Sequence, residues 1–196
     1  MRHFERSAPC LEARDLVLLT ILGTVYGGSA PLTQIVATAK EMAPQDWQPT
    51  LDVIGGCVTR AIEARLLAPA ASSAPDGPIC IEITDLGREV LRDLLRRSIP
   101  PHLGGLSRTC VAAKLCFLES LAPVDRFHQV DQLARMYRAD LEALRRRSEC
   151  PRRWPPQSRR WLHHEIERFE WELAWLDRLR LDIAPTAPRV VGGLES

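Results

Sequence analysis

The stretch ICIEITDLGREVLRDLLRR, residues 79–97, changes its hydrophobic period at Thr84. Before Thr84, isoleucines at positions 79, 81 and 83 alternate with Cys80 and Glu82, which is the pattern of a half-buried strand. After it, leucine and valine recur at spacings of three and four, which predicts an amphipathic helix. Thr84 or Asp85 can accept a hydrogen bond from a free backbone N–H at the start of that helix, so either could be its cap.

The residues before this strand predict a hairpin. Residues 66–85 are β-rich at both ends and turn-rich in the middle, where PDGP occupies positions 75–78. Such a turn between two apolar runs closes an antiparallel pair of strands.

Three helices are predicted further upstream. Residues 15–26 form an apolar helix, and the turn GGSAP then offers Ser29 as a cap and Pro31 as a first-turn residue of a helix over 31–42. The third helix lies within LDVIGGCVTRAIEARLL at 51–67. Three helices, a hairpin and a closing helix follow one another in the order of a winged helix-turn-helix, assigned here to residues 15–98 after an N-terminal arm at 1–14.

The third helix contains a glycine pair, Gly55 and Gly56, within a regular apolar repeat. Each glycine costs a helix interior about 1 kcal/mol relative to alanine. Two interpretations stay open: the helix begins only near 54–56, or the bare backbone lets DNA or a protein partner come close. The next residue, Cys57, is either a small core residue or a redox-sensitive thiol activated by Arg60 one turn away. The apolar repeat comprises Leu51, Ile54, Val58, Ile62 and Leu66.

A second block follows SIPPHLGGLS at 98–107 and is helical throughout, with helices expected at about 108–120, 124–148 and 157–183. The last helix has one apolar stripe at spacings of four and three, and a second stripe of two tryptophans. A helix that is apolar on two sides needs two neighbours. We therefore expect residues 107–183 to form a helical dimerisation domain, followed by a Pro- and Gly-rich flexible tail at 184–196. The predicted dimerisation residues are Leu162, Ile166, Phe169, Leu173 and Leu176 of the first stripe and Trp171 and Trp175 of the second.

Three stretches resemble the PadR family of bacterial transcriptional regulators. They are LVLLTILG at 16–23, AIEARLLAP at 61–69 with ICIEITDLGREVLRDLL at 79–95, and HHEIERFEWELAWLDRL at 163–179. The resemblance implies a mainly α winged helix with a long helical C-terminal region. It also implies a cytoplasmic homodimer that binds a palindromic operator as a repressor and leaves it on meeting a small ligand or another signal. The chain departs from the family at LTQIV (32–36), where His-Gly-Tyr is usual, and at the glycine pair, about where a tyrosine is common.

The charge distribution gives little support for DNA binding. The net charge is +1, but residues 1–100 hold ten Lys and Arg against twelve Asp and Glu, and the hairpin at 67–84 has no basic residue. Contacts to DNA phosphates come largely from Lys and Arg, so residues 1–100 offer few side chains that could make them. A winged-helix module that has lost DNA binding and contacts a protein instead is the alternative. The predicted DNA-binding residues are Lys40, Gln48, Thr50, Thr59, Arg60 and Arg65.

An arginine-rich segment joins the last two helices, with seven arginines between positions 145 and 160. It is either a solvated connector or a surface for DNA backbone, an acidic partner or an anionic ligand. His163 and Glu167 lie one turn apart, but no third metal ligand is placed nearby, so we expect no metal site. The sequence shows no nucleophile–base pair, Gly-rich phosphate loop, signal peptide or membrane-spanning run, which predicts a non-enzymatic, cofactor-free protein of the cytoplasm. Six cysteines without a Cys-x-x-Cys pair suit free thiols in that compartment.

Overall fold

The computed structural model describes residues 10–42, 49–71, 78–100, 105–149 and 155–184. The chain divides into two compact units between Leu121 and Ala122. Gln48, the predicted turn residues 75–77, most of the N-terminal arm and nearly all of the tail lie outside the described residues.

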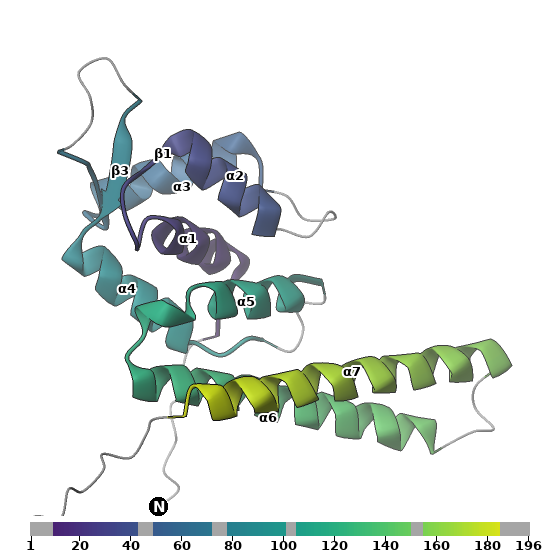
Figure 1. The fold of residues 1–196 in the computed structure, drawn as a ribbon. Coiled ribbons are helices and arrows are strands. Elements are labelled where there is room, and N and C mark those ends of the chain that lie inside the picture. The colour runs from purple at the N-terminus through teal and green to yellow at the C-terminus, as the bar shows by residue number, and fades with distance from the viewer. Residues whose placement is uncertain (1–9, 43–48, 72–77, 101–104, 150–154, 185–196) are drawn as a thin grey trace, which may run out of the picture. The chain divides into compact units, whose positions relative to one another are not determined.

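The first unit is a mainly helical domain with a small sheet (Figure 1). This arrangement confirms the predicted winged helix-turn-helix class, because three helices precede the paired strands and a fourth follows them. Its elements are α1 (Ala13–Thr24), β1 (Ala30–Pro31), α2 (Leu32–Met42), α3 (Leu51–Glu63), β2 (Leu67–Pro69), β3 (Cys80–Ile83), α4 (Asp85–Arg96), α5 (Gly105–Cys116) and the 3-10 helix η1 (Leu118–Ser120).

Helix α1 forms the centre of this unit, in contact with α2, α3, α4 and α5. Leu19, Ile21 and Leu22 are completely buried, as expected for a helix that is apolar on most of its sides. The helix starts two residues earlier than the sequence predicts. Just before it, Leu11 is buried and its N–H donates to the Ser98 carbonyl at 2.9 Å, so this part of the predicted arm belongs to the domain.

The sheet has three antiparallel strands in the order β1-β3-β2. The β2–β3 pair is the predicted wing, and Ile81 and Ile83 point into the core. Ile79, predicted to share their face, precedes β3 and is 71% exposed. Pro31 was expected in the first turn of a helix, but it pairs with Cys80 in an edge strand, where its missing N–H is tolerated.

The Thr84–Gly87 turn joins the wing to α4 and to the end of α3. The Thr84 hydroxyl caps α4 by accepting the Gly87 N–H at 3.0 Å and donates to the Arg65 carbonyl at 2.7 Å. A Cβ on Gly87 would lie 2.1 Å from the Leu66 carbonyl oxygen, so only glycine fits. The chain reverses into β2 through Arg65, whose φ is +58°. Of the two predicted caps, Thr84 is therefore the one used.

Helix α5 packs in the first unit, whereas the sequence grouped residues from 107 onward with the C-terminal helices. Gly23 of α1 makes room for the Phe117 ring at the end of α5: a Cβ there would lie 2.4 Å from the ring. Lys114 is 2% exposed, and its ammonium donates to the carbonyls of Leu95 and Arg97 at the end of α4. The sequence alone gave no sign of this buried role, because a lysine is usually exposed.

The second unit is a helical hairpin of α6 (Pro123–Ser148) and α7 (Pro156–Asp182), which pack side by side (Figure 1). Leu141, Leu162 and Ile166 form its buried cluster, against which Leu144, Phe169 and Leu173 pack. Ion pairs connect the helices, among them Arg138–Asp177, Arg145–Glu170 and Arg180–Asp131 at 2.5, 2.7 and 2.9 Å. Apolar and charged contacts together set the register of the two helices.

Candidate nucleic-acid interface

Helix α3 occupies the place of a recognition helix, the second helix of the helix-turn-helix. Thr50 caps it by accepting the Val53 N–H at 3.4 Å. Ile54, Val58 and Ala61 are buried, and α1 and α2 are its helical neighbours. Leu51 and Ile62 were expected on the buried face but are 57% and 36% exposed, because the buried stripe follows the 3.6-residue period through Ala61 instead.

The glycine pair lies inside α3, which begins at Leu51. The interpretation that the helix begins near 54–56 is therefore wrong. A Cβ on Gly55 would meet nothing within 4 Å, and one on Gly56 would meet only the Arg60 guanidinium at 3.6 Å. No packing contact in the described chain requires glycine at these positions. The remaining interpretation is that the bare backbone lets DNA or a protein partner come close.

The exposed face of α3 carries both signs of charge. Thr59 and Arg60 are exposed there, between Asp52 and Glu63. The Thr59 hydroxyl donates to the Gly55 carbonyl at 3.1 Å, so its oxygen can still accept a hydrogen bond. One arginine against two carboxylates is a weak electrostatic attraction for phosphate, and any base contact depends on Arg60 and Thr59.

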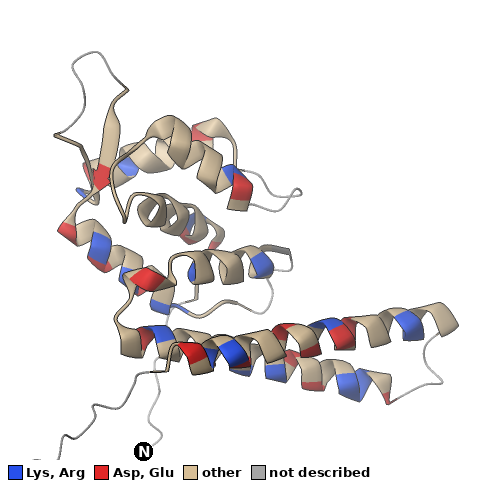
Figure 2. Cartoon of the chain, in the orientation of Figure 1, with Lys and Arg blue, Asp and Glu red and all other residues tan. Residues whose placement is uncertain are grey.

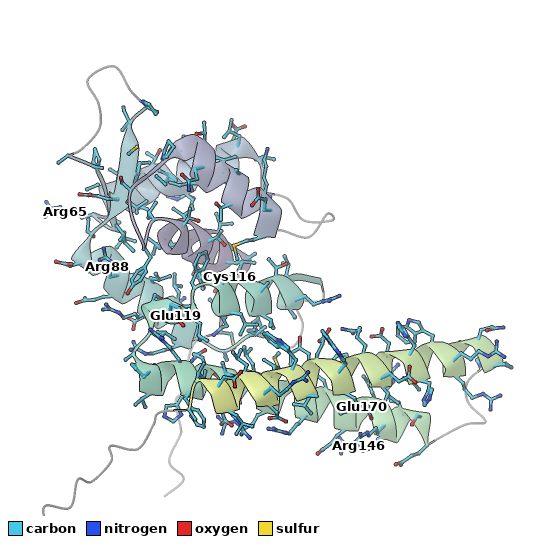
Figure 3. The ribbon with its side chains drawn as sticks, viewed as in Figure 1. Arg65, Arg88, Cys116, Glu119, Arg146 and Glu170 are labelled. Atoms are coloured by element: carbon cyan, nitrogen blue, oxygen red, sulfur yellow. The ribbon has the colours of Figure 1, made fainter. Side chains whose placement is uncertain are left out.

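The other predicted contacts are scattered around α3. Lys40 is exposed in the last turn of α2, and Arg65 (Figure 3) is exposed just beyond α3. Thr50 is exposed but uses its hydroxyl as the helix cap. Lys40, Thr59, Arg60 and Arg65 are thus all exposed on the surface of this unit.

Arg88 is a residue that sequence reasoning did not single out. Its guanidinium donates to the Tyr26 carbonyl at 3.2 Å and stacks over the Tyr26 ring, 5.0 Å from the ring centre. It joins the start of α4 to the end of α1 and so helps hold the base of the wing. The signal was the stretch at 79–95, which resembles the PadR family and contains Arg88 directly after Gly87.

Cys57 is half-buried at the edge of α3. Burial raises the pKa of its thiol above the ordinary value, and the neighbouring Arg60 charge only partly opposes this. The activated thiolate of the redox interpretation is therefore disfavoured.

The predicted dimerisation residues separate into two groups on α7. The first stripe packs against α6 of the same chain, with Leu162, Ile166 and Leu176 buried. The second stripe is exposed: Trp171 is 66% and Trp175 41% exposed, and Trp161 joins them at 56%. Intramolecular packing thus accounts for the first stripe, and the tryptophans are left as the apolar surface of the hairpin.

An ion triad lies on α7 between Trp161 and Trp175. Arg168 pairs with Glu165 at 2.6 Å and with Glu172 at 3.0 Å, all three at helical spacing. These side chains are only 17–28% exposed, unlike typical surface ion pairs. The residues Trp161, Glu165, Arg168, Glu172 and Trp175 follow one another at spacings of four, three, four and three, which places them in one strip along the same side of the helix.

The arginine-rich segment is only partly described, since residues 150–154 lie outside. Arg145 pairs with Glu170 across the hairpin. Arg147 is exposed at the same end of α6, as is Arg146 (Figure 3). Figure 2 shows both charge signs interspersed along α6 and α7. His163 and Glu167 are 3.5 Å apart and exposed, and in the described ranges no three candidate ligands come together for a metal ion.

The model of one protein family, described as "Putative AphA-like transcriptional regulator", matches residues 7–180. The chain belongs to this family. The match covers the winged helix and the hairpin of this AphA-like protein and confirms the prediction of a PadR-like winged-helix transcriptional regulator. The family is one of regulators rather than enzymes. Among the described helices, none has the length and apolar character needed to cross a bilayer.

Solved structures of Bacillus subtilis PadR are similar to this chain. The complex with operator DNA is 19% identical over 86% of this chain and 99% of that chain, with a TM-score of 0.39. The complex with p-coumaric acid is 19% identical over 86% and 98%, also at 0.39. PadR alone is 18% identical over 89% and 98%, at 0.38. No curated protein sequence matches the chain.

Proposed function

We propose that this AphA-like regulator binds a palindromic operator as a homodimer, represses transcription there, and leaves the DNA when a small ligand or another signal acts on it. The observation that carries the proposal is the family match, which spans α3 and the α6–α7 hairpin together. The exposed position of Arg60 and Thr59 on α3 supports DNA contact.

In this proposal, the α3 helix enters the major groove and the wing lies near the minor groove. Arg60 is the leading contact, Thr59 accepts a hydrogen bond from a base or bound water, and Arg65 and Lys40 lie beside the phosphates. Contacts of Thr50 and Gln48 complete the set. A dimer supplies two such helices, so its symmetry sets the distance between half-sites.

The exposed tryptophans on α7 support the dimer. Trp171 and Trp175 offer a large apolar area of the kind found at the centre of interfaces. A two-fold axis would place the same strip on both copies, which makes it self-complementary. A signal that rotates the α7 helices would change the half-site spacing and release the DNA.

A gel-shift titration with the upstream DNA of the protein's own gene, at two salt concentrations, tests the proposal. We expect a specific shift that weakens at higher salt, and equal binding to scrambled DNA would contradict operator recognition. Arg60→Ala should weaken operator binding about tenfold or more, equivalent to roughly 1–3 kcal/mol. The same substitution at Arg96, which pairs with Asp93 on α4, is the matched control.

A second function is favoured by the charges of the winged helix: Asp52 and Glu63 outnumber Arg60 on the exposed face of α3, and the hairpin at 67–84 has no basic residue. A protein-interaction module would need neither phosphate contacts nor a groove-reading helix. Absence of any DNA shift at low salt, with an intact dimer, would favour this second function.

A further inference from the structure

A cleft of about 300 Å³ lies in the winged-helix unit beside α3. The first half of α1 forms one wall, with Arg14, Asp15 and Leu18. The second half of α3 forms the other, and Leu66 completes the lining. The volume is at the lower end of the range for ligand pockets, so the cleft suits a small molecule. The lining residues from α3 are Cys57, Arg60, Ala61 and Ala64.

Small side chains account for the hollow. Along its face toward the cleft, α3 presents a cysteine and two alanines where larger residues would fill the space against Leu18. Leu18, Ala61 and Leu66 supply an apolar lining. A ligand with an apolar body would remove this surface from water, at about 25 cal/mol per Å².

The charged groups of the cleft favour an anion. The Asp15 carboxylate is already compensated: it pairs with Arg97 at 2.9 Å and accepts the Glu12 N–H at 3.0 Å. Within the described residues, no carboxylate pairs with Arg60, whose charge acts on the neighbouring Cys57 thiol and lowers its pKa against the effect of burial. Arg14 adds a second guanidinium, shared with the exposed Glu12. A planar guanidinium beside an apolar wall matches a carboxylate attached to an apolar group.

We propose that the α1–α3 cleft binds a small organic anion, with its carboxylate on Arg60 and its apolar part against Leu18, Ala61 and Leu66. Binding there occupies the guanidinium proposed as the leading DNA contact. The ligand and the operator therefore compete for Arg60, and this regulatory consequence, unlike the binding, rests on the proposed function.

Cys57 provides a reporter inside the cleft. The rate of its alkylation by iodoacetamide is followed by peptide mass spectrometry, with benzoate as the probe and benzamide as the neutral molecule of the same shape. Cys116, exposed at the end of α5 (Figure 3), is the internal reference. We expect benzoate to protect Cys57 and not Cys116, and to protect it far better than benzamide does.

Three variants separate the charge from the cavity. Arg60→Gln should weaken benzoate protection about tenfold, since a hydrogen bond to a charged group is lost. Ala64→Leu fills the cleft without changing a charge and should abolish protection. Arg96→Gln, the matched control at an arginine of α4 that does not line the cleft, should protect as the parent does. Equal protection by benzamide, no protection by benzoate, or full protection in Ala64→Leu would overturn the proposal. No DNA is present, so these outcomes are independent of operator binding.

Discussion

Helices α3 and α7 each leave one face exposed, and the two faces differ in size and chemistry. The α3 face has two glycines and Thr59, and it offers little area but allows a close approach to its backbone. The α7 face has Trp161, Trp171 and Trp175, which offer a large apolar area. A small polar face is suited to contacting base edges in a DNA groove, whereas a broad aromatic face is suited to a stable protein–protein interface.

The two units that carry these faces are also stabilised by different kinds of internal contact. The winged helix depends on close backbone approaches and buried polar caps, at Gly87 and Lys114. The hairpin depends on a side-chain seam around Ile166 with ion pairs beside it. Substitutions should therefore act through backbone geometry in the first unit and through apolar area in the second.

The largest effect is expected from the aromatic face. Replacing Trp171 and Trp175 together by alanine should weaken the dimer by about 4 kcal/mol, because buried interface tryptophans contribute about 2 kcal/mol each. Light scattering over a dilution series measures the change. Leu181→Ala, at an exposed apolar residue in the last turn of α7, should leave the dimer unchanged. A parent protein of 22.0 kDa at micromolar concentration would contradict the dimer itself.

The second largest effect is expected at Gly87, which the Leu66 carbonyl approaches closely at the base of the wing. Gly87→Ala places a Cβ 2.1 Å from the Leu66 carbonyl and should lower the free energy of unfolding by about 3 kcal/mol. Urea titration followed by circular dichroism measures it. Gly27→Ala, where the added Cβ meets nothing within 4 Å, is the control. Equal stabilities of the two variants would show that the close approach is absent.

A pH-dependent effect is expected from Lys114. Burial lowers the pKa of its ammonium to about 8 from 10.5 and raises the pKa of the Cys110 thiol to about 11 from 9.0. Between pH 8 and 9 the unfolded chain holds more protons on Lys114, so stability should rise by about 1 kcal/mol. From pH 9 the Cys110 contribution begins to fall and opposes this rise.

Urea titrations at pH 8 and 9 isolate the lysine. The rise should be missing in Lys114→Met and retained in Cys110→Ala. If Lys114→Met is as pH-dependent as the parent, another group is responsible. If that variant is too unstable to titrate, Cys110→Ala still decides the matter, since a lost rise there would assign it to the thiol.

The smallest effect is expected at the glycine pair, and it tests whether DNA approaches the backbone of α3 there. Gly55→Ala adds a side chain into open space and should stabilise the fold by about 1 kcal/mol through helix propensity. If DNA approaches this backbone, the same variant should bind the operator more weakly. Thermal unfolding and a gel shift measure the two quantities. A gain in stability with unchanged DNA affinity would exclude a close approach at Gly55.

Much of the fold could be predicted from the sequence because its signals are local. The change of period at Thr84 gave the wing and α4, and the spacing of Leu162, Ile166 and Phe169 gave the apolar stripe of α7. Hydrophobic period and helix caps depend on residues within a turn or two of each other. The candidate contacts Arg60 and Thr59 were placed on an exposed helix face for the same reason.

Only the tertiary structure decided which surfaces meet. It assigned the Leu162 stripe to α6 of the same chain, brought Pro31 beside Cys80, and buried Lys114 against the end of α4. It also opened the cleft between Leu18 and Ala61. The sequence alone determined the elements and their order, whereas these pairings join residues far apart in the chain, whose contacts depend on how whole helices pack.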